Sequence, residues 1–391
     1  MQYDFDKIIN RKNTNSLKHD FNQRRFGRED ILPMWVADMD FETPHFIIEA
    51  IRKRLNHPVY GYTLYPESLY ESIISWIYNR HQWKVKKEEM IFCTGVVPAL
   101  HYCVKALTNP GDKIIVQPPV YYPFFSVIKD NDRVVQENPL KIIDGKFEID
   151  FEHLEKRTDE KTKMLFLCSP HNPGGRVWSK KNLLNLATFC LKHNIIIISD
   201  EIHADMVYNP NKHTPLASLD QEISNLTITL MSPSKTFNLA GLAVSYIISE
   251  NKKYKARLNE YLDRTNINAV NIFSQAAMEA AYKYGNKWLD QLMDYLNNNF
   301  LYLNAFLKDR LPELNVMESE ATYLAWIDFN NSRLKNNDIK HFMIHEAGLG
   351  LNDGPVFGTG GDGYQRMNFA CPKEILHQGL TKLYNSMEKL V

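Results

Sequence analysis

The chain has 391 residues, and at about 150 residues per domain this length favours two domains over one. Hydrophobic residues make up 44% and charged residues 24% of the sequence, so the chain can bury a sizeable core without disulfides or a metal. Lysine plus arginine and aspartate plus glutamate both number 46, and this balance argues against a sequence-independent nucleic-acid binder.

The sequence predicts neither a targeting segment nor a membrane span. Residues 1–7 contain no apolar stretch of the kind found in secretory signals. The longest aliphatic run, Ile195–Ile198, falls far short of the roughly 18 residues that a membrane span needs. The five cysteines are scattered, without C-x-x-C spacing, and four of them lie in or beside apolar runs. We therefore expect a reducing, cytoplasmic location.

Two helices are predicted first along the chain. Thr43 is the predicted N-cap and Pro44 the first residue of a helix that runs to about Asn56. A second helix is predicted from Pro66.

Short apolar runs then alternate with helix-like stretches through the middle of the chain. Two of these stretches, Pro98–Thr108 and Ser179–His193, are predicted helices, and Ser179 caps the second. Continuous apolar strands separated by amphipathic helices are typical of a parallel sheet covered on both faces. The predicted strands are Met90–Cys93, Lys113–Val116, Met164–Cys168, Ile195–Ser199, Thr227–Met231 and Val244–Ser249.

The pattern changes after Gly285 to long helices around a few strands. The sequence therefore predicts an N-terminal arm (1–45) packed on a small domain, a large α/β domain (46–285) and a smaller α+β domain (286–391). The helices and strands expected after Gly285 are Lys287–Leu311, Asp338–Ala347 and Pro372–Leu390, with strands Tyr323–Phe329 and Tyr364–Ala370.

Polar or glycine-rich segments follow four of the predicted strands, at the edge where open α/β sheets bind ligands. Gly95, Val96 and Val97 follow the first strand, and their free N–H groups could hold a phosphate at a helix N-terminus. Asn172 lies in a loop stiffened by two prolines and two glycines. Each of these segments alone is better explained as an ordinary turn.

The next two strands end in ionisable residues. Asp200 follows four isoleucines and Ser199, where a buried carboxylate needs a partner, although a solvent-exposed strand end is an equally good explanation. Lys235 lies among serines and, taken by itself, is a surface residue. The combination of phosphate cradle, amide, carboxylate and lysine matches one ligand, pyridoxal 5′-phosphate (PLP), which needs all four groups.

Several segments resemble known motifs. Segments 95–97, 169–175, 199–203 and 232–241 closely resemble those of class I/II aminotransferase-like PLP enzymes of fold type I. Segments 34–41, 60–63, 200–203 and 366–372 resemble the cystathionine β-lyase, or cysteine C–S lyase, branch. The resemblance extends from about Trp35 to the C-terminus. It implies a large domain with a mostly parallel sheet between helices and a smaller α+β domain.

The resemblance also implies roles in cofactor binding. Lys235 carries the Schiff base to PLP and, once displaced, moves the α-proton. Asp200 keeps the pyridine nitrogen protonated. Asn172 bonds the phenolic oxygen, and Tyr121 stacks on the ring. The turn 95–97 holds the phosphate.

Two further implied cofactor contacts are Ser232, which binds the phosphate, and Tyr60, which reaches the phosphate from the neighbouring subunit of a homodimer. The implied substrate-binding set is Arg366, Asn172, Trp35 and Tyr121, in which Arg366 clamps the α-carboxylate through two hydrogen bonds.

Two positions depart from the aminotransferase pattern. Ala243 replaces an arginine that many aminotransferases use for the phosphate, and His203 replaces a tyrosine that touches the phenolic oxygen. No catalytic role is assigned to His203. The histidines show no ligand spacing beside carboxylates, so no metal site is expected.

The sequence therefore favours a PLP-dependent lyase that cleaves L-cystathionine and related L-cysteine S-conjugates by β-elimination. An aminotransferase of the same fold, which would need a 2-oxo acid, is the first alternative. A regulatory protein that keeps PLP without turnover is the second, and the intact Lys235 and Arg366 argue against it. Neither nucleic acid nor membrane is expected as a partner.

Overall fold

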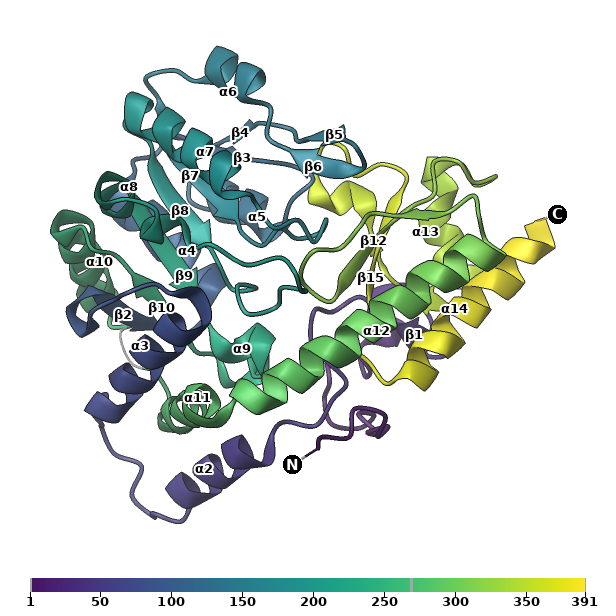
Figure 1. The fold of residues 1–391 in the computed structure, drawn as a ribbon, viewed down its shortest axis with the longest axis horizontal. Coiled ribbons are helices and arrows are strands. Elements are labelled where there is room, and N and C mark those ends of the chain that lie inside the picture. Colours follow the sequence, from purple (N-terminus) through teal and green to yellow (C-terminus); the bar gives the residue numbers. More distant parts are fainter. Residues whose placement is uncertain (1, 268–269, 391) are drawn as a thin grey trace.

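The computed structural model of the chain describes residues 2–267 and 270–390 and centres on a seven-stranded sheet (Figure 1). The strand order is β2-β10-β9-β8-β7-β3-β4, and within this sheet β10 alone runs antiparallel to the other strands. This mixed, mostly parallel sheet confirms the predicted α/β fold class. The bounds are β2 (Met90–Cys93), β3 (Lys113–Val116), β4 (Val134–Glu137), β7 (Thr162–Cys168), β8 (Ile196–Asp200), β9 (Thr227–Met231) and β10 (Ser245–Ile248).

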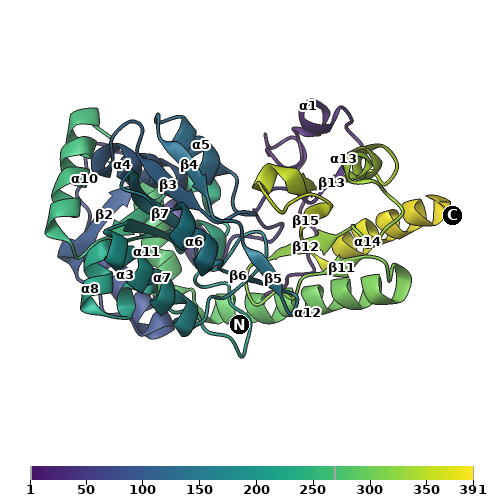
Figure 2. The same ribbon diagram turned by 90° about the horizontal axis from the view of Figure 1, so that it is seen from above.

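Helices cover both faces of the sheet, as Figure 2 shows from above. Five of them are α4 (Val96–Leu107), α5 (Pro123–Lys129), α7 (Lys180–His193), α8 (Gln221–Leu226) and α10 (Lys252–Thr265). Successive residues of a strand point to opposite faces. Accordingly, Met164 and Phe166 of β7 pack with apolar side chains of α4, α5 and α10, whereas Leu165 and Leu167 pack with those of α7 and α8.

Prolines lie at three helix starts whose bounds or caps differ from the predicted ones. Helix α2 (His45–Leu55) begins after Pro44, whose ψ of 135° keeps it outside the helix, so Pro44 and not Thr43 is the cap residue. Helix α3 (Glu67–His81) likewise begins one residue after Pro66. Helix α4 starts two residues before Pro98, which a first helical turn tolerates because its N–H groups have no partner within the helix. The predicted cap at Ser179 is confirmed, since its side chain accepts from the N–H of Asn182.

The C-terminal part contains a four-stranded antiparallel sheet flanked by long helices. Its strands, in sheet order, are β11 (Asn315–Val316), β12 (Leu324–Asp328), β15 (Tyr364–Asn368) and β14 (Asn352–Asp353), and its helices are α12 (Asn286–Arg310), α13 (Asn336–His345) and α14 (Lys373–Met387). Helix α12 runs diagonally across Figure 1 from the large sheet's side to the C-terminal helix. The remaining elements are α1 (Asn22–Phe26), β1 (Leu32–Pro33), β5 (Lys141–Ile143), β6 (Lys146–Glu148), α6 (Phe151–Arg157), α9 (Pro233–Thr236), α11 (Ile272–Tyr284) and β13 (Leu349–Gly350).

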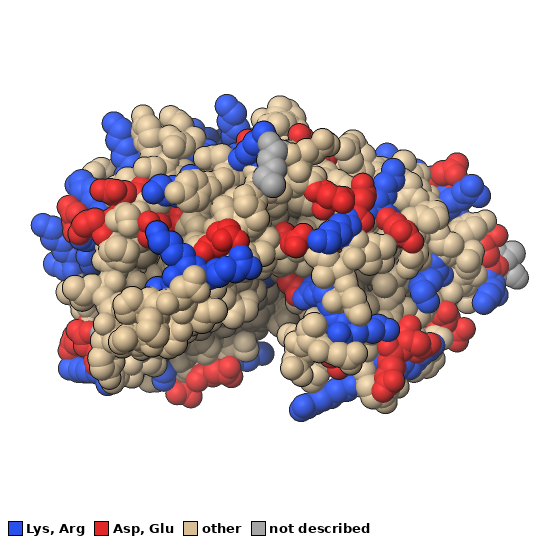
Figure 3. Space-filling view, turned by 90° about the horizontal axis from the view of Figure 1, so that it is seen from below, with Lys and Arg blue, Asp and Glu red and all other residues tan. Residues whose placement is uncertain are grey.

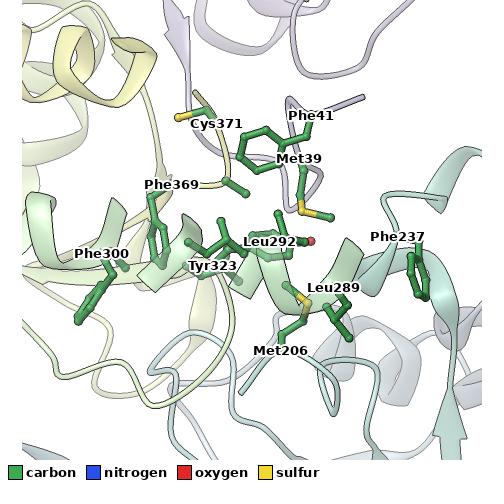
Figure 4. Packing of buried hydrophobic residues seen from close by; sticks show 14 of the residues in the cluster. Met39, Phe41, Met206, Phe237, Leu289, Leu292, Phe300, Tyr323, Phe369 and Cys371 are labelled. Carbon is green, nitrogen blue, oxygen red and sulfur yellow. The ribbon is translucent and has the colours of Figure 1, made fainter. Parts of the chain in front are cut away.

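One hydrophobic cluster joins the two parts of the chain. Figure 4 shows Leu289 and Leu292 of α12 between Phe237, which follows α9, and Tyr323 and Phe369 of the C-terminal part. All five side chains are buried. Helix α12 thus holds the C-terminal sheet against the loops that follow the large sheet.

The N-terminal segment packs largely on the C-terminal part. Strand β1 pairs in parallel with β13, and Phe5 contacts Trp288 of α12 with ring centroids 5.8 Å apart. Arg11 and Lys18 both pair with Asp40, at 2.6 Å each, so the segment is tied to the chain that follows β1. The domain limits 45/46 and 285/286 stay a prediction, and residues 1 and 391 lie outside the described residues.

The surface carries charges of both signs. On the face seen in Figure 3, lysines and arginines alternate with aspartates and glutamates, and a notch separates the two halves of the molecule. Over the described ranges, the structure has no helix that is long and apolar enough to cross a membrane.

Candidate active site

The carboxyl ends of four parallel strands open into one cavity of about 300 Å³. The carboxyl end of β8 and the segments that follow β2, β7 and β9 each contribute a residue that the sequence predicted, and β15 and the N-terminal segment close the other side. The cavity lies where open α/β sheets bind their ligands. Its wall includes the turn 95–97 and the side chains of Trp35, Tyr121, Asn172, Asp200, Lys235 and Arg366.

Lys235 reaches the cavity from α9, a single turn of helix that follows β9. Its Nζ donates a hydrogen bond to the backbone oxygen of Ala37 over 2.7 Å. Burial, together with the charge of Arg366, lowers the pKa of Lys235 to about 8. A buried lysine with a lowered pKa supplies a neutral amine near physiological pH, which both a nucleophile and a base require.

Asp200 is the last residue of β8, and its side chain is buried in the cavity wall. Its Oδ1 accepts from the N–H of Ile202 over 3.2 Å, and it forms no salt bridge among the described residues. Burial raises the pKa of Asp200 to about 7. A cationic ring nitrogen would supply the positive partner that this carboxylate needs.

Arg366 projects from β15 and is bound by neutral oxygens. Its Nη1 donates to Asn172 Oδ1 over 2.9 Å, and its Nη2 donates to the Trp35 carbonyl over 2.9 Å and to Asn352 Oδ1 over 2.6 Å. Its Nε has no hydrogen-bond partner among the residues that the structure describes. Burial lowers the pKa of Arg366 to about 10. A buried guanidinium without a carboxylate partner is suited to receive the carboxylate of a ligand.

The turn after β2 offers a site for a phosphate. Gly95, Val96 and Val97 line the cavity, and the two valines are the first residues of α4, whose N–H groups have no acceptor within the helix. A helix N-terminus of this kind favours an anion. Ser234 of α9 also lines the cavity, although the sequence did not predict it as a site residue.

Two predicted cofactor ligands lie elsewhere in this chain. The hydroxyl of Ser232 accepts from the N–H of Ser234 and donates to the carbonyl of Val244 over 2.6 Å, so it caps α9 behind the cavity wall. Tyr60 is 53% exposed, and its hydroxyl donates to the carbonyl of Leu55. Their proposed contacts with a phosphate stay predictions.

Aromatic and imidazole rings complete the wall. Tyr121 contacts Tyr122 and Phe124 with ring centroids 5.6 and 6.0 Å apart, and burial raises the pKa of its hydroxyl. His203, to which the sequence assigned no role, also lines the cavity. Burial and the charge of Lys235 lower the pKa of His203 to about 3, so its ring is neutral.

Sequence reasoning also missed residues whose signal is weak. Leu17 lines the cavity although it is 55% exposed. The only sequence signal for this residue is that it is a single leucine in the polar segment 10–20. The backbone oxygen of Ala37 accepts hydrogen bonds from both Lys235 Nζ and the Tyr323 hydroxyl. No side-chain pattern can predict such a contact.

The donor set fits PLP. An amine, an acidic partner for a ring nitrogen, an amide and a helix N-terminus converge from four strand ends, and these are the groups that the cofactor requires. No cluster of three or more His, Cys, Asp or Glu side chains suited to a metal ion occurs in residues 2–267 and 270–390.

Comparison with known proteins gives matches over nearly the whole chain. Cystathionine beta-lyase PatB of Bacillus subtilis (strain 168) is 42% identical over 380 residues, covering 97% of this chain and 98% of that protein. Cystalysin from Treponema denticola, whose crystal structure contains PLP, is 38% identical with a TM-score of 0.97 over 100% of both chains. The PLP-bound C-S lyase from Staphylococcus hominis is 34% identical with a TM-score of 0.92, covering 99% of this chain and 98% of that one.

These matches confirm the fold type I architecture and the resemblance drawn from the motifs. The family model for aminotransferases of class I and II matches residues 29–383. The chain belongs to the aminotransferase class I and II family.

Proposed function

We propose that the chain is a PLP-dependent C–S β-lyase that converts L-cystathionine and related L-cysteine S-conjugates into a thiol, pyruvate and ammonia. The convergence of Lys235, Asp200 and Arg366 on one cavity carries the proposal. Relatives named as C–S lyases, at up to 42% identity over nearly the whole chain, support this reaction among those of the family. When bound, PLP supplies an aldehyde that reacts with amines and a ring that accepts the electron pair left at Cα.

Lys235 is the residue that holds the cofactor's aldehyde and, when freed by the substrate amine, takes the proton from Cα. Its lowered pKa makes far more of the amine neutral near physiological pH than in an ordinary lysine, although the protonated form remains the majority. The electron pair left at Cα would then form the Cα=Cβ bond while the Cβ–S bond breaks and its electron pair leaves with sulfur. The proton that Lys235 took from Cα would be available to convert the departing sulfur group into a thiol. The released aminoacrylate reacts with water to give pyruvate and ammonia.

Arg366 binds the substrate α-carboxylate through N–H groups along the edge of its planar guanidinium. Its bonds to Asn172, Asn352 and the Trp35 carbonyl fix the direction of the guanidinium before substrate arrives. Because the carboxylate is held at a fixed angle, the Cα–H bond is held in line for removal of its proton.

The remaining residues hold the cofactor. Asp200 keeps a proton on the ring nitrogen, Asn172 bonds the phenolic oxygen and Tyr121 covers the ring face. The phosphate lies at the N–H groups of segment 95–97, with Ser232 and Ser234 as further hydroxyl partners. Support for this assignment comes from the cavity wall, to which all of these except Ser232 contribute.

The substrate's sulfur substituent lies toward the N-terminal segment. Leu17, Trp35 and Tyr122 give this side of the cavity an apolar surface. S-conjugates with an apolar substituent are therefore accommodated.

The active form is a homodimer, and each subunit gives Tyr60 to its partner's phosphate site. Support comes from the segment around Tyr60, which exposes apolar side chains that a second copy of the chain would cover. These side chains are Leu55, Val59, Tyr60, Tyr62 and Leu64. A cytoplasmic location accords with the five cysteines, all of which are free and buried.

Product analysis tests the reaction. Purified enzyme with L-cystathionine should give thiol, pyruvate and ammonia in equal amounts, and Lys235→Ala should give none. If thiol appears without pyruvate, or if pyruvate forms equally with Lys235→Ala, the proposal is wrong. An aminotransferase would instead form a 2-oxo acid that still contains the sulfur.

A further inference from the structure

A group of buried ionisable side chains lies next to the active site without lining its cavity. Glu201 directly follows Asp200 and binds His213 Nε2 over 2.7 Å. The other oxygen of Glu201 accepts from the Ser199 hydroxyl at 2.8 Å and from the N–H of Leu216 at 3.1 Å. The carboxylate is fully buried and has a partner on each oxygen.

A second buried carboxylate lies beside the first pair. Asp205 Oδ1 contacts His81 Nε2 over 2.9 Å, and both of its oxygens accept from the Trp76 indole N–H at 3.1 Å. Asp205 Oδ2 also accepts from the hydroxyl of Thr236 over 2.8 Å. The rings of His81 and His213 meet edge to face, with centroids 5.4 Å apart, and so join the two acid–histidine pairs.

The Asp205–Thr236 bond matters because Thr236 directly follows Lys235. Both residues belong to α9, which has four residues and therefore cannot hold its own conformation through helical hydrogen bonds. Its N-terminal end is fixed by the Ser232 cap. Its C-terminal end is held by the hydrogen bond that the Thr236 hydroxyl donates to Asp205.

Asp205 is suited to act as a permanent acceptor. Burial alone would raise its pKa, but the hydrogen bond and charge of His81 hold the pKa of Asp205 below its usual value. The carboxylate thus stays ionised across the working pH range. Hydrogen bonds to an ionised acceptor are about twice as strong as those between neutral groups.

We propose that Asp205, acting through the Thr236 hydroxyl, is a positioning residue that holds the Lys235 amine in line for proton transfer. The inference rests on the proposed function, because it gives Asp205 a part in the reaction that Lys235 performs. The His81, His213 and Glu201 side chains keep Asp205 oriented. None of these residues touches the cavity, so the effect acts through the backbone of α9.

Three variants at buried threonines separate positioning from packing. Thr236→Val keeps the shape of the side chain and removes the hydroxyl, whereas Thr236→Ser keeps the hydroxyl and removes the methyl group. Thr227→Val is the matched control, because the buried Thr227 hydroxyl donates to the Ile223 carbonyl, away from the cavity wall. The charged groups around Lys235, namely Arg366, Asp38 and Asp200, are unchanged in all three variants.

We expect Thr236→Val holoenzyme to lose about 10- to 100-fold in kcat with L-cystathionine, because the amine is misplaced. Its KM should stay within about twofold, since Arg366 binds the substrate independently. The pH midpoint of the lysine-bound cofactor's visible absorbance should move by about one unit, since the environment of Lys235 changes. Thr236→Ser and Thr227→Val should behave like the wild type in all three measurements.

The proposal is wrong if Thr236→Val keeps both the wild-type kcat and the wild-type absorbance midpoint. It is also wrong if Thr236→Ser loses as much activity as Thr236→Val. If Thr236→Val does not yield folded holoenzyme, Thr236→Ala removes the same hydroxyl without added bulk and is judged by the same results. The absorbance titration uses no substrate. A wild-type enzyme that fails to cleave any S-conjugate therefore counts against the proposed function and leaves this test intact.

Discussion

Arg366 Nη1 donates a 2.9 Å hydrogen bond to Asn172 Oδ1, so the residue assigned to the substrate carboxylate is bonded directly to the residue assigned to the cofactor's phenolic oxygen. The two come from β15 and from the loop after β7, on opposite sides of the cavity. Because the Asn172 oxygen accepts from Arg366, its amide nitrogen is free to point as a donor toward the cofactor. This one contact therefore orients both the Arg366 guanidinium and the Asn172 amide.

Replacing Arg366 with lysine keeps the charge and removes the planar fork. We expect kcat/KM for an L-cysteine S-conjugate to fall about 10- to 100-fold, mainly through a higher KM, since at least one charge-assisted hydrogen bond is lost. The ratio of PLP to protein should stay close to the wild-type value. Arg133→Lys is the control, because Arg133 is buried and bonded to Asn131 and Thr108 away from the cavity. A normal KM with depleted PLP would place Arg366 in the cofactor site instead.

The pH dependence of cofactor loading tests the environment of Lys235. Only the neutral amine attacks an aldehyde, so the rate at which cofactor-free protein takes up PLP should rise with pH. The half-maximal rate should lie near pH 8, to which burial lowers the pKa of Lys235, and not near the ordinary lysine value of about 10.4. Uptake is measured as the growth of bound-cofactor absorbance after mixing. A rate that keeps rising steeply above pH 9 would contradict the buried environment.

Asp200→Asn should separate activity from stability. Without an anion beside it the cofactor's ring nitrogen loses its proton near neutral pH, so kcat should fall by about 100-fold or more even at full cofactor loading. In cofactor-free protein the folded-state pKa of Asp200 is raised to about 7, so the ionised carboxylate opposes folding above that pH. Between about pH 4 and 7 this cost grows as pH rises, and below that window it disappears.

Cofactor-free Asp200→Asn should therefore melt at least about 2 °C above cofactor-free wild type at pH 8, and this advantage should shrink by pH 5. Thermal melts at the two pH values measure the difference. Equal melting temperatures at pH 8 would show that the Asp200 carboxylate is not desolvated.

Leu17 should influence the choice of substrate. Leu17→Ala removes apolar surface from the cavity side that we assign to the sulfur substituent. We expect kcat/KM to fall about 3- to 30-fold for an S-conjugate with a bulky apolar substituent, since one to two methylene groups' worth of contact is lost. The value for S-methyl-L-cysteine, which cannot reach as far, should change less than twofold by the same reasoning. The exposed Leu301→Ala is the control. Equal losses for both substrates would remove Leu17 from the specificity site.

Much of the fold and the centre of the site could be predicted because the signals are local. Three apolar strands end at or shortly before Asn172, Asp200 and Lys235. This places those residues at one edge of a parallel sheet, and the structure brings all three to one cavity. The strand ends of β2, β3 and β9 coincide with the predicted ones for the same reason.

Contacts that depend on packing could not be predicted. The Ala37 carbonyl binds Lys235 through backbone, and Asn352 meets Arg366 only because β14 and β15 pair. Ser232 and Ser234 are both serines beside Pro233, so the sequence does not distinguish them. Only Ser234 lines the cavity, because of the conformation of the one-turn helix α9. The Asp205–Thr236 contact joins the loop after β8 to the last residue of α9, and neither sequence gives a sign of it.

Counting turnovers without a 2-oxo acid tests the central claim most directly. The wild-type enzyme, freed of 2-oxo acids and mixed with excess L-cystathionine, should form pyruvate linearly for many equivalents per Lys235. An aminotransferase would form no pyruvate. It would give about one equivalent per site of a 2-oxo acid that still contains the sulfur, because the cofactor keeps the substrate's amino group until a second 2-oxo acid removes it. Sustained pyruvate formation is the result we expect. Absence of pyruvate, with one equivalent of a sulfur-containing 2-oxo acid whose formation resumes only when a further 2-oxo acid is added, would contradict the assignment as a lyase.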